Sequence, residues 1–151
     1  PRRRPAPGPD IRAMPLFPLE LTPYVSCNLV GKARKLTIEG LARLPLIPEE
    51  AWEDWFRAAG VRPPGRPRRG QLLVRNQHLI LEAVLAGEGA GLLTPRFAQA
   101  HVASGRLIRP FHESITAGAY FLAWHENRDD DPLVAVFRSW IREALAADAP
   151  G

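Results

Sequence analysis

The chain has 151 residues, a formal net charge of +4 at pH 7, 46% hydrophobic residues and one cysteine. This length suits a single domain whose core is large enough to fold without disulfides or metals. No apolar stretch reaches the length of a membrane span, no apolar signal segment follows the N-terminus, and the lone cysteine cannot form an internal disulfide. These features predict a soluble cytoplasmic protein, and they exclude an integral membrane protein or a disulfide-stabilised secreted domain.

Basic residues gather in two proline-rich segments, at 1–5 and 62–70. Neither segment contains the interleaved aromatic residues on which nucleic-acid bases stack. The segments are therefore interpreted as a solvated tail and a loop, and no specific nucleic-acid surface is expected. Residues 1–9 are predicted to be a disordered, basic and proline-rich tail, and residues 148–151 a second tail.

The first half of the chain alternates between expected strands and helices. Residues 16–26 form an extended segment that ends in a strand at 24–26, and Thr37 can cap a short helix over 38–43. The segment 49–60 has acidic residues in its first turn, aromatic residues on one face and a terminating glycine, which predicts a helix. The other strands expected in this half are 44–48 and 71–75.

The alternation continues in the second half. Asn76 can cap a helix over 77–86, and the segment 95–105 begins with proline and ends with glycine, as helices commonly do. A last helix begins at Pro132 after the cap Asp131. The expected strands are 91–94, 106–111 and 118–125. The apolar stripe of the last helix comprises Leu133, Val136, Phe137, Trp140, Ile141 and Ala144. This alternation predicts an α/β layer fold with a largely parallel sheet.

Three glycines lie close together in the stretch LEAVLAGEGAGLLTP, residues 81–95. A phosphate-binding loop runs from a strand into a helix, because the free amide groups lie at the N-terminus of a helix. This stretch runs from a helix into a strand. We therefore expect Gly87 to end the helix, and Gly89 and Gly91 to allow the chain to fold back closely.

The residue types that carry catalysis show no recognisable pattern. The histidines lack metal-ligand spacing, no serine lies in a nucleophile elbow, and Cys27 is interpreted as a small hydrophobic residue. The acidic run 129–131 lacks the alternating ligands of a calcium loop and is better explained as a helix start. The sequence therefore predicts a protein that is not an enzyme and that has no metal or other cofactor.

Three expected helices begin directly after expected strands. The junctions are Pro48-Glu49, Asn76-Gln77 and Thr94-Pro95. In a parallel sheet such junctions share one edge, where backbone amide groups can meet an anionic or polar small molecule. Asn76 adds a side-chain amide at this edge, but it can equally serve only as a helix cap.

Six stretches stand out when they are taken in chain order. They are PLFPLELTPYVS (15–26), LARLPLI with AWEDWFRAAG (41–60), LILEAVLAGEGAGLLTP (79–95), GRLIRPF (105–111), AYFLAWHEN (119–127) and VAVFRSWIREAL (134–145). In this order they resemble the effector-binding domain of LysR-type transcriptional regulators, particularly the subgroup related to the glycine-cleavage activator.

The resemblance implies a fold like that of the type-II periplasmic binding proteins, in which two α/β subdomains hold a small effector. It implies a partial effector-binding domain over 10–147, truncated at its N-terminus. Residues 24–115 would form the second subdomain nearly whole, and residues 119–147 the strand and helix that return to the first. The winged helix-turn-helix that normally precedes this domain is not among these residues.

By similarity, the residues expected to contact the effector are Pro48, Asn76 and Thr94 at strand ends, with Tyr24 and Ser26 near the crossover. The function implied is that of an effector-sensing, oligomerising portion of a bacterial regulator, which reaches DNA only through the absent helix-turn-helix domain. A stand-alone small-molecule binding module of the same fold, without a regulatory role, is the alternative. The effector itself, unidentified here, is expected to be a small molecule and could be anionic.

Overall fold

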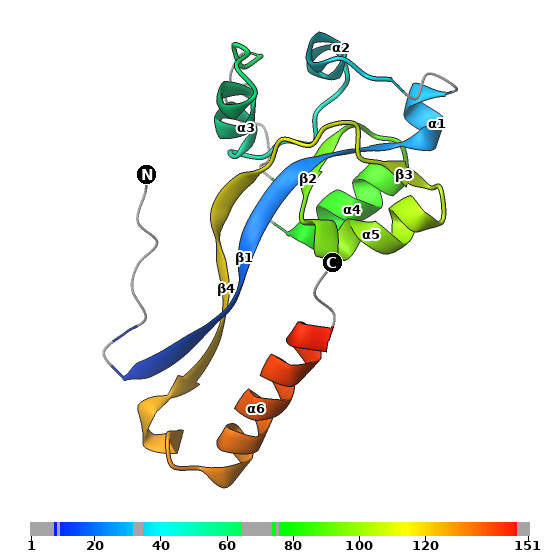
Figure 1. The fold of residues 1–151 in the computed structure, drawn as a ribbon. Helices are drawn as coiled ribbons and strands as arrows, with labels where there is room; N and C mark the ends of the chain where they lie inside the picture. Colours follow the sequence, from blue (N-terminus) through cyan, green and yellow to red (C-terminus); the bar gives the residue numbers. More distant parts are fainter. Residues whose placement is uncertain (1–7, 9, 32–34, 65–73, 75, 148–151) are drawn as a thin grey trace. The chain divides into compact units, whose positions relative to one another are not determined.

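A computed structural model describes residues 8, 10–31, 35–64, 74 and 76–147 of the chain (Figure 1). Its contacts divide the chain into two compact units. Unit 1 comprises Pro1–Pro18 and Gly118–Gly151, and unit 2 comprises Leu19–Ala117. The predicted second subdomain, 24–115, falls inside unit 2, and its assignment as a subdomain stays a prediction. The predicted tails 1–9 and 148–151 and the strand 71–75 lie wholly or largely outside the described residues.

The longest strand, β1 (Ile11–Ser26), contributes residues to both units, and so does β4 (Ile115–His125). Within unit 2, β1 lies between β2 (Gly91–Leu93) and β3 (Leu107–Ile108). The sequence predicted a strand only at 24–26. The strand is longer because its first half pairs with β4, a partner that lies about a hundred residues away in the sequence.

The expectation of a largely parallel sheet is wrong for the described strands. β1 lies between β2 and β3 and pairs antiparallel with both. Among the described residues, parallel pairing is limited to one bridge between Leu46 and Ala90, where the sequence predicted a strand over 44–48. Pro45 and Pro48 flank this bridge, and a proline has no backbone N–H to donate to a neighbouring strand.

Most helices lie where the sequence predicted them. Thr37 caps α2 (Ile38–Arg43), its hydroxyl accepting the Gly40 N–H at 3.0 Å. Helix α3 (Trp52–Ala58) begins later than expected, so Glu49 and Glu50 precede it instead of occupying its first turn. The predicted helices α4 (Gln77–Leu85), α5 (Pro95–Ala103) and α6 (Pro132–Ala147) are confirmed, and two short helices, α1 (Cys27–Val30) and η1 (Glu126–Arg128), are additional.

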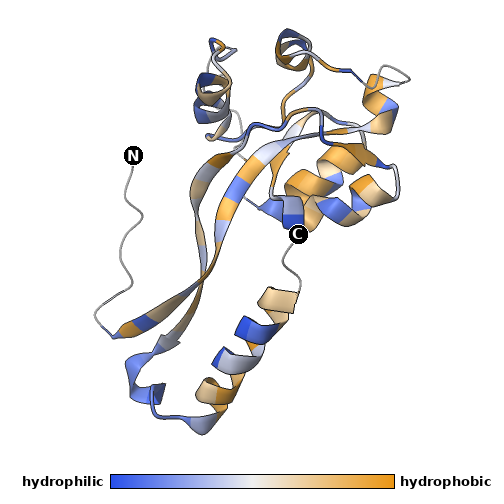
Figure 2. Cartoon of the chain, in the orientation of Figure 1, coloured by the Kyte–Doolittle hydropathy of each residue, from blue (hydrophilic) through white to orange (hydrophobic). Residues whose placement is uncertain are grey.

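The core of unit 2 is built on the aromatic face of α3 and on α4. Trp55 and Phe56 are completely buried, and the indole N–H groups of Trp52 and Trp55 donate to backbone carbonyls. Helix α4 packs on β2 and on α5, and α5 packs on β3 (Figure 1). The hydrophobic colours of α4 in Figure 2 agree with its burial. Burial of this apolar surface is the main stabilising contribution to unit 2.

The glycine-rich turn after α4 is structural, as predicted. Gly87 adopts a φ of +83°, which favours glycine, at the end of the helix. A Cβ atom on Gly89 would lie 2.5 Å from the Pro45 carbonyl oxygen, and one on Gly91 would lie 2.6 Å from a methyl carbon of Val84. Glycine at these two positions therefore lets the chain pass against its neighbours.

In the part of unit 1 that the structure describes, β1 and β4 form a two-stranded ribbon, which is followed by the short helix η1 and by α6. The Glu126 N–H donates to the Asp10 carbonyl at 2.8 Å, and the Phe17 and Tyr120 rings stack at 4.7 Å, so β1 and β4 run in opposite directions. The Arg138 guanidinium of α6 lies 4.4 Å from the centre of the Trp124 ring. Among the described residues of unit 1, none is buried.

Candidate functional site

Three of the predicted site residues lie at one end of the unit 2 sheet. Leu46 and Ala90 form a parallel bridge, so the chain that follows them, to Pro48 and to Thr94, runs toward the same end. The Val74 N–H donates to the Pro48 carbonyl at 2.8 Å, which brings the segment before Asn76 to this end as well. We call the end marked by Pro48, Asn76 and Thr94 the Thr94 edge.

Asn76 is the N-cap of α4, as the sequence predicted. Its Oδ1 accepts the N–H groups of His78 at 2.9 Å and of Leu79 at 3.3 Å. Among the described residues, its amide nitrogen donates to no other group, and the side chain is exposed. Asn76 therefore serves as a cap and still presents a hydrogen-bond donor at the surface.

Gln77 connects the start of α4 to the end of β2, and sequence reasoning missed it. Its Nε2 donates to the Leu92 carbonyl at 3.2 Å, and its Oε1 accepts the Thr94 N–H at 3.0 Å. The His78 and Phe97 rings stack at 5.8 Å and join the same two helix starts. The signal available in the sequence was a polar residue at the first helical position, directly before an apolar stripe. That signal does not reveal a partner fifteen residues away.

Thr94 is the N-cap of α5, but its side chain makes no capping hydrogen bond. The residue is buried, and its own carbonyl accepts the N–H groups of Phe97 and Ala98. Pro95 follows and has no N–H. A threonine in this position usually caps the helix with its hydroxyl, and the Thr94 hydroxyl does not do so.

The sequence suggested that backbone amide groups at the helix starts would be open to a ligand. At the two helices that begin at the Thr94 edge, several of these amide groups already have acceptors within the chain. Asn76 accepts two N–H groups of α4, Gln77 accepts the Thr94 N–H, and Thr94 accepts two N–H groups of α5. The groups best placed to meet a ligand at this edge are therefore side chains rather than backbone amides.

Tyr24 and Ser26 do not lie at the Thr94 edge. Leu93 pairs with Thr22, so Thr94 lies level with Leu21, and Ser26 is five residues further along β1, roughly 16 Å away. Ser26 is buried at the other end of the strand, where its hydroxyl accepts the Asn28 N–H at 3.3 Å and caps α1.

Tyr24 packs in the core with residues of α4, β2 and α5. Burial raises the pKa of its phenol, and the positive charge of Arg109 opposes this rise. Tyr24 is thus a buried side chain whose hydroxyl stays protonated at neutral pH. A ligand contact by Tyr24 or Ser26 stays a prediction, as do the contacts expected of Pro48, Asn76 and Thr94.

Glu49, next to Pro48, is a further polar group that the sequence did not single out. It was interpreted as a first-turn charge of a helix, but it lies before α3 and is half-buried. Its Oε2 is buried and has no hydrogen-bond partner among the residues that the structure describes. Burial raises the pKa of this carboxyl to about 7, because the ionised form loses its hydration.

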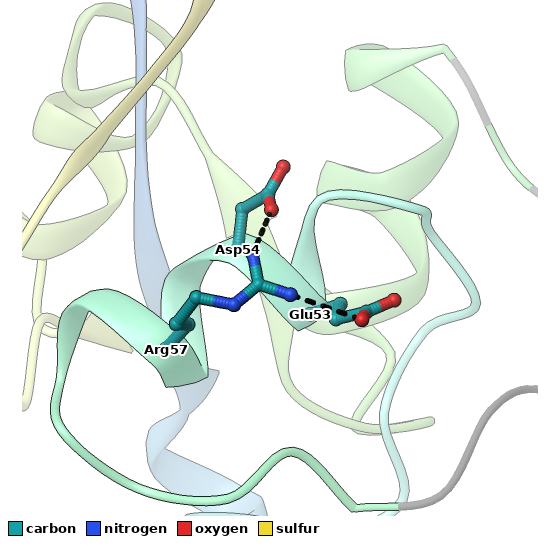
Figure 3. A network of polar contacts seen from close by, with 3 residues as sticks. All are labelled: Glu53, Asp54 and Arg57. Atoms are coloured by element: carbon teal, nitrogen blue, oxygen red, sulfur yellow. Dashed lines mark hydrogen bonds and ion pairs between the residues drawn. The ribbon is translucent and has the colours of Figure 1, made fainter. Parts of the chain in front are cut away.

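The surface of α3 carries a different kind of polar cluster. Arg57 forms ion pairs with Glu53 at 3.0 Å and with Asp54 at 2.7 Å, all three side chains being exposed (Figure 3). Exposed pairs at helical spacing contribute only about 0.3–0.5 kcal/mol each. This cluster is a solvated helix face, and it provides a control surface for mutagenesis.

Within the described residues, no group of three or more His, Cys, Asp or Glu side chains is arranged to hold a metal ion. The described helices include none that is long and apolar enough to cross a bilayer. Cys27 is a free, half-buried thiol at the start of α1.

Comparison with known proteins identifies the family. A family described as the LysR substrate binding domain matches residues 2–146. The HTH-type transcriptional activator AmpR of Rhodobacter capsulatus is 30% identical over 132 residues, covering 85% of this chain and 44% of that protein. The glycine cleavage system transcriptional activator of Escherichia coli K12 is 28% identical over 145 residues, covering 93% of this chain and 47% of that protein. The chain spans less than half the length of these two curated relatives.

Solved structures share the fold. The AmpR effector binding domain of Citrobacter freundii superposes with a TM-score of 0.80 at 24% identity, covering 92% of this chain and 70% of that one. The AmpR effector domain of Pseudomonas aeruginosa superposes with a TM-score of 0.78 at 24% identity, covering 93% and 68%. These likenesses confirm the predicted α/β fold of the effector-binding domains. The chain therefore belongs to the LysR substrate-binding domain family and corresponds to the effector-binding portion of a LysR-type regulator.

Proposed function

We propose that the chain is the effector-sensing and self-associating portion of a bacterial transcriptional regulator. In this proposal it binds a small molecule, catalyses no reaction and acts on DNA only through a helix-turn-helix domain that is not among its 151 residues. Because such a regulator works on DNA, we place it in the cytoplasm. The observation that carries the proposal is the family match over residues 2–146, together with relatives that are transcriptional activators.

The effector contacts are proposed to lie at the Thr94 edge. The amide nitrogen of Asn76 and the hydroxyl of Thr94 supply hydrogen bonds, and Pro48 supplies an apolar contact beside them. Binding would favour one of two pre-existing conformations of the regulator, and the differential affinity of the effector for the two conformations sets the size of the response. The prevalence of satisfied backbone amides at this edge supports recognition by neutral side-chain donors.

Thermal unfolding of the chain with a panel of free amino acids, small carboxylic acids and sugars tests the proposal. A ligand that binds only the folded state stabilises it by RT ln(1 + [L]/Kd), so the melting temperature rises with the ligand concentration. We expect one or more compounds to do so. In Asn76→Ala we expect a clear reduction of the ligand-induced rise in melting temperature. The free energy of unfolding without ligand should fall by only about 1 kcal/mol, the usual cost of a lost cap.

Asn76→Ser separates capping from binding. Serine caps a helix about as well as asparagine but lacks the amide group. If Asn76→Ser retains the full ligand response, Asn76 is only a cap and the proposed contact is wrong. Arg57→Ala, on the exposed face of α3, is the matched control and should leave the response unchanged.

A further inference from the structure

Arg109 follows β3 directly and is a neighbour of Tyr24 across the sheet. Val25 pairs with Ile108 in the antiparallel register, so the next residue along each chain brings Tyr24 opposite Arg109. Side chains of opposite residues lie on the same face of a sheet, with their Cβ atoms about 5 Å apart. The positive charge of Arg109 opposes the rise in the pKa of Tyr24 that burial causes, which agrees with this placement.

One edge of the Arg109 guanidinium is held by the backbone that follows it. Its Nε donates to the Phe111 carbonyl at 3.1 Å, and its Nη2 donates to the His112 carbonyl at 3.2 Å. These two bonds fix the plane of the group, because the N–H donors of a guanidinium have a rigid geometry. The other edge, formed by Nη1 and the second N–H of Nη2, makes no hydrogen bond to a described residue. Arg109 is exposed, so a small molecule can reach its side chain.

The charge of Arg109 has no acidic partner in the described part of the chain. Arg57, Arg128 and Arg138 each form an ion pair with an aspartate or a glutamate there, whereas Arg109 forms none. The Tyr24 hydroxyl also makes no hydrogen bond to a described residue, although Tyr24 is only 2% exposed. Arg109 cannot accept a bond from this hydroxyl, because a guanidinium has no acceptor atom. Two neighbouring donor groups therefore lack an acceptor.

The open edge of the guanidinium matches a planar anion. Its two parallel N–H groups can donate to the two oxygens of one carboxylate, which is the geometry that arginine favours. The Tyr24 hydroxyl stays protonated at neutral pH and can donate a third hydrogen bond. We propose that Arg109 and the Tyr24 hydroxyl form a binding site for a carboxylate group, and that the effector carries this carboxylate.

The Arg109 site adjoins the Thr94 edge. The Thr22 hydroxyl donates to the Glu113 carbonyl at 2.8 Å, so the chain from Arg109 to Glu113 runs beside β1 toward the level at which β1 pairs with the end of β2. The two carbonyls that hold the guanidinium lie on this stretch. Because neighbouring strands are about 4.8 Å apart, roughly 10 Å separates the stretch from β2 across β1. A small molecule that lies across β1 can contact Arg109 and the Thr94 edge together. The assignment to the effector rests on the proposed function, whereas the carboxylate site does not.

An NMR titration of the isotope-labelled full chain with sodium acetate, exchanged for sodium chloride at constant ionic strength, tests the carboxylate site. Arg109→Lys identifies the Nε–H signal of Arg109, which we expect to shift in a saturable manner with acetate and not with acetamide. Tyr24→Phe should weaken acetate binding about tenfold, as the loss of one hydrogen bond to a charged group does. Arg106 is the matched control, since it is an exposed arginine whose Nε donates to the Ser104 hydroxyl at 3.3 Å. Its signal should show no saturable shift.

Pairs of carboxylic acids and their amides test the assignment to the effector. In thermal unfolding of the full chain, we expect an acid of the panel to raise the melting temperature more than its amide does. Arg109→Gln should lose this difference, and Arg106→Gln should keep it.

An Arg109 signal that responds to acetate no more than that of Arg106, or acetate binding that Tyr24→Phe leaves unchanged, would overturn the proposed site. Arg109 would then only hold the turn that follows β3. If no acid acts more strongly than its amide, the assignment to the effector is wrong even where acetate binds. The proposed function fails separately, if no compound of the whole panel stabilises the chain, and the acetate titration still decides the carboxylate site.

Discussion

Replacing Glu49 by glutamine should remove a pH-dependent loss of stability. Glu49 is half-buried, and in the described part of the chain its Oε2 has no hydrogen-bond partner, so the ionised carboxylate is poorly solvated in the folded state. Its pKa is about 7 in the folded chain against an ordinary value of 4.5. Between these two values the unfolded chain releases the proton and the folded chain holds it.

The sign of the effect follows from proton linkage. Stability falls with rising pH wherever the folded state binds more protons than the unfolded state. The contribution of Glu49 is therefore largest below pH 4.5, falls as the pH rises and is lost above about pH 7. The interval between 4.5 and about 7, at about 1.4 kcal/mol for each pH unit, corresponds to at most about 3.5 kcal/mol.

Urea unfolding at a series of pH values measures this effect. The fluorescence of Trp52 and Trp55 follows unit 2, because both side chains are buried there. Glu49→Gln has a similar size and no charge, so we expect it to match the wild type near pH 4. Near pH 8 it should be more stable than the wild type by up to about 3.5 kcal/mol.

Glu82→Gln is the control, since Glu82 is an exposed glutamate of α4 and the charge change is the same. Its difference from the wild type should stay within about 0.5 kcal/mol across the same pH range. If the Glu49→Gln and wild-type stabilities differ by a constant amount at all pH values, the buried carboxyl does not ionise near neutral pH and our reasoning is refuted.

Three further predictions concern packing in unit 2 and its surface, all measured by urea unfolding. Trp55→Phe removes an indole N–H that donates to the Glu113 carbonyl at 3.1 Å, but the Thr22 hydroxyl still donates to that carbonyl at 2.8 Å, so we expect a loss of only about 1 kcal/mol. A loss above about 3 kcal/mol would contradict this account. Gly91→Ala places a Cβ 2.6 Å from a methyl carbon of the buried core and should cost about 1–3 kcal/mol, whereas a neutral result would show that the core moves freely. Arg57→Ala breaks two exposed ion pairs and should cost under about 1 kcal/mol, with a larger loss indicating a buried role.

The sequence predicted the helices well because their signals are local. A cap such as Thr37 or Asn76 satisfies amide groups two or three residues away, and a proline at position 95 sets the backbone angle of its own helix. The apolar stripe of α6 was also readable, since helical periodicity needs no knowledge of the partner. The likeness to the LysR effector-binding domain was readable from the order of six stretches.

The tertiary structure decided how distant segments meet. The direction of β1 against β2 and β3, and the single bridge between Leu46 and Ala90, depend on contacts more than forty residues apart, which periodicity does not encode. The same limit applies to the site. The sequence named Asn76 and Thr94, but only the folded chain shows that Gln77 links them. The folded chain also shows that Glu49 is partly buried and that Ser26 lies at the opposite end of β1. Local hydrogen bonds are determined by neighbouring residues, whereas burial and strand pairing depend on the whole fold.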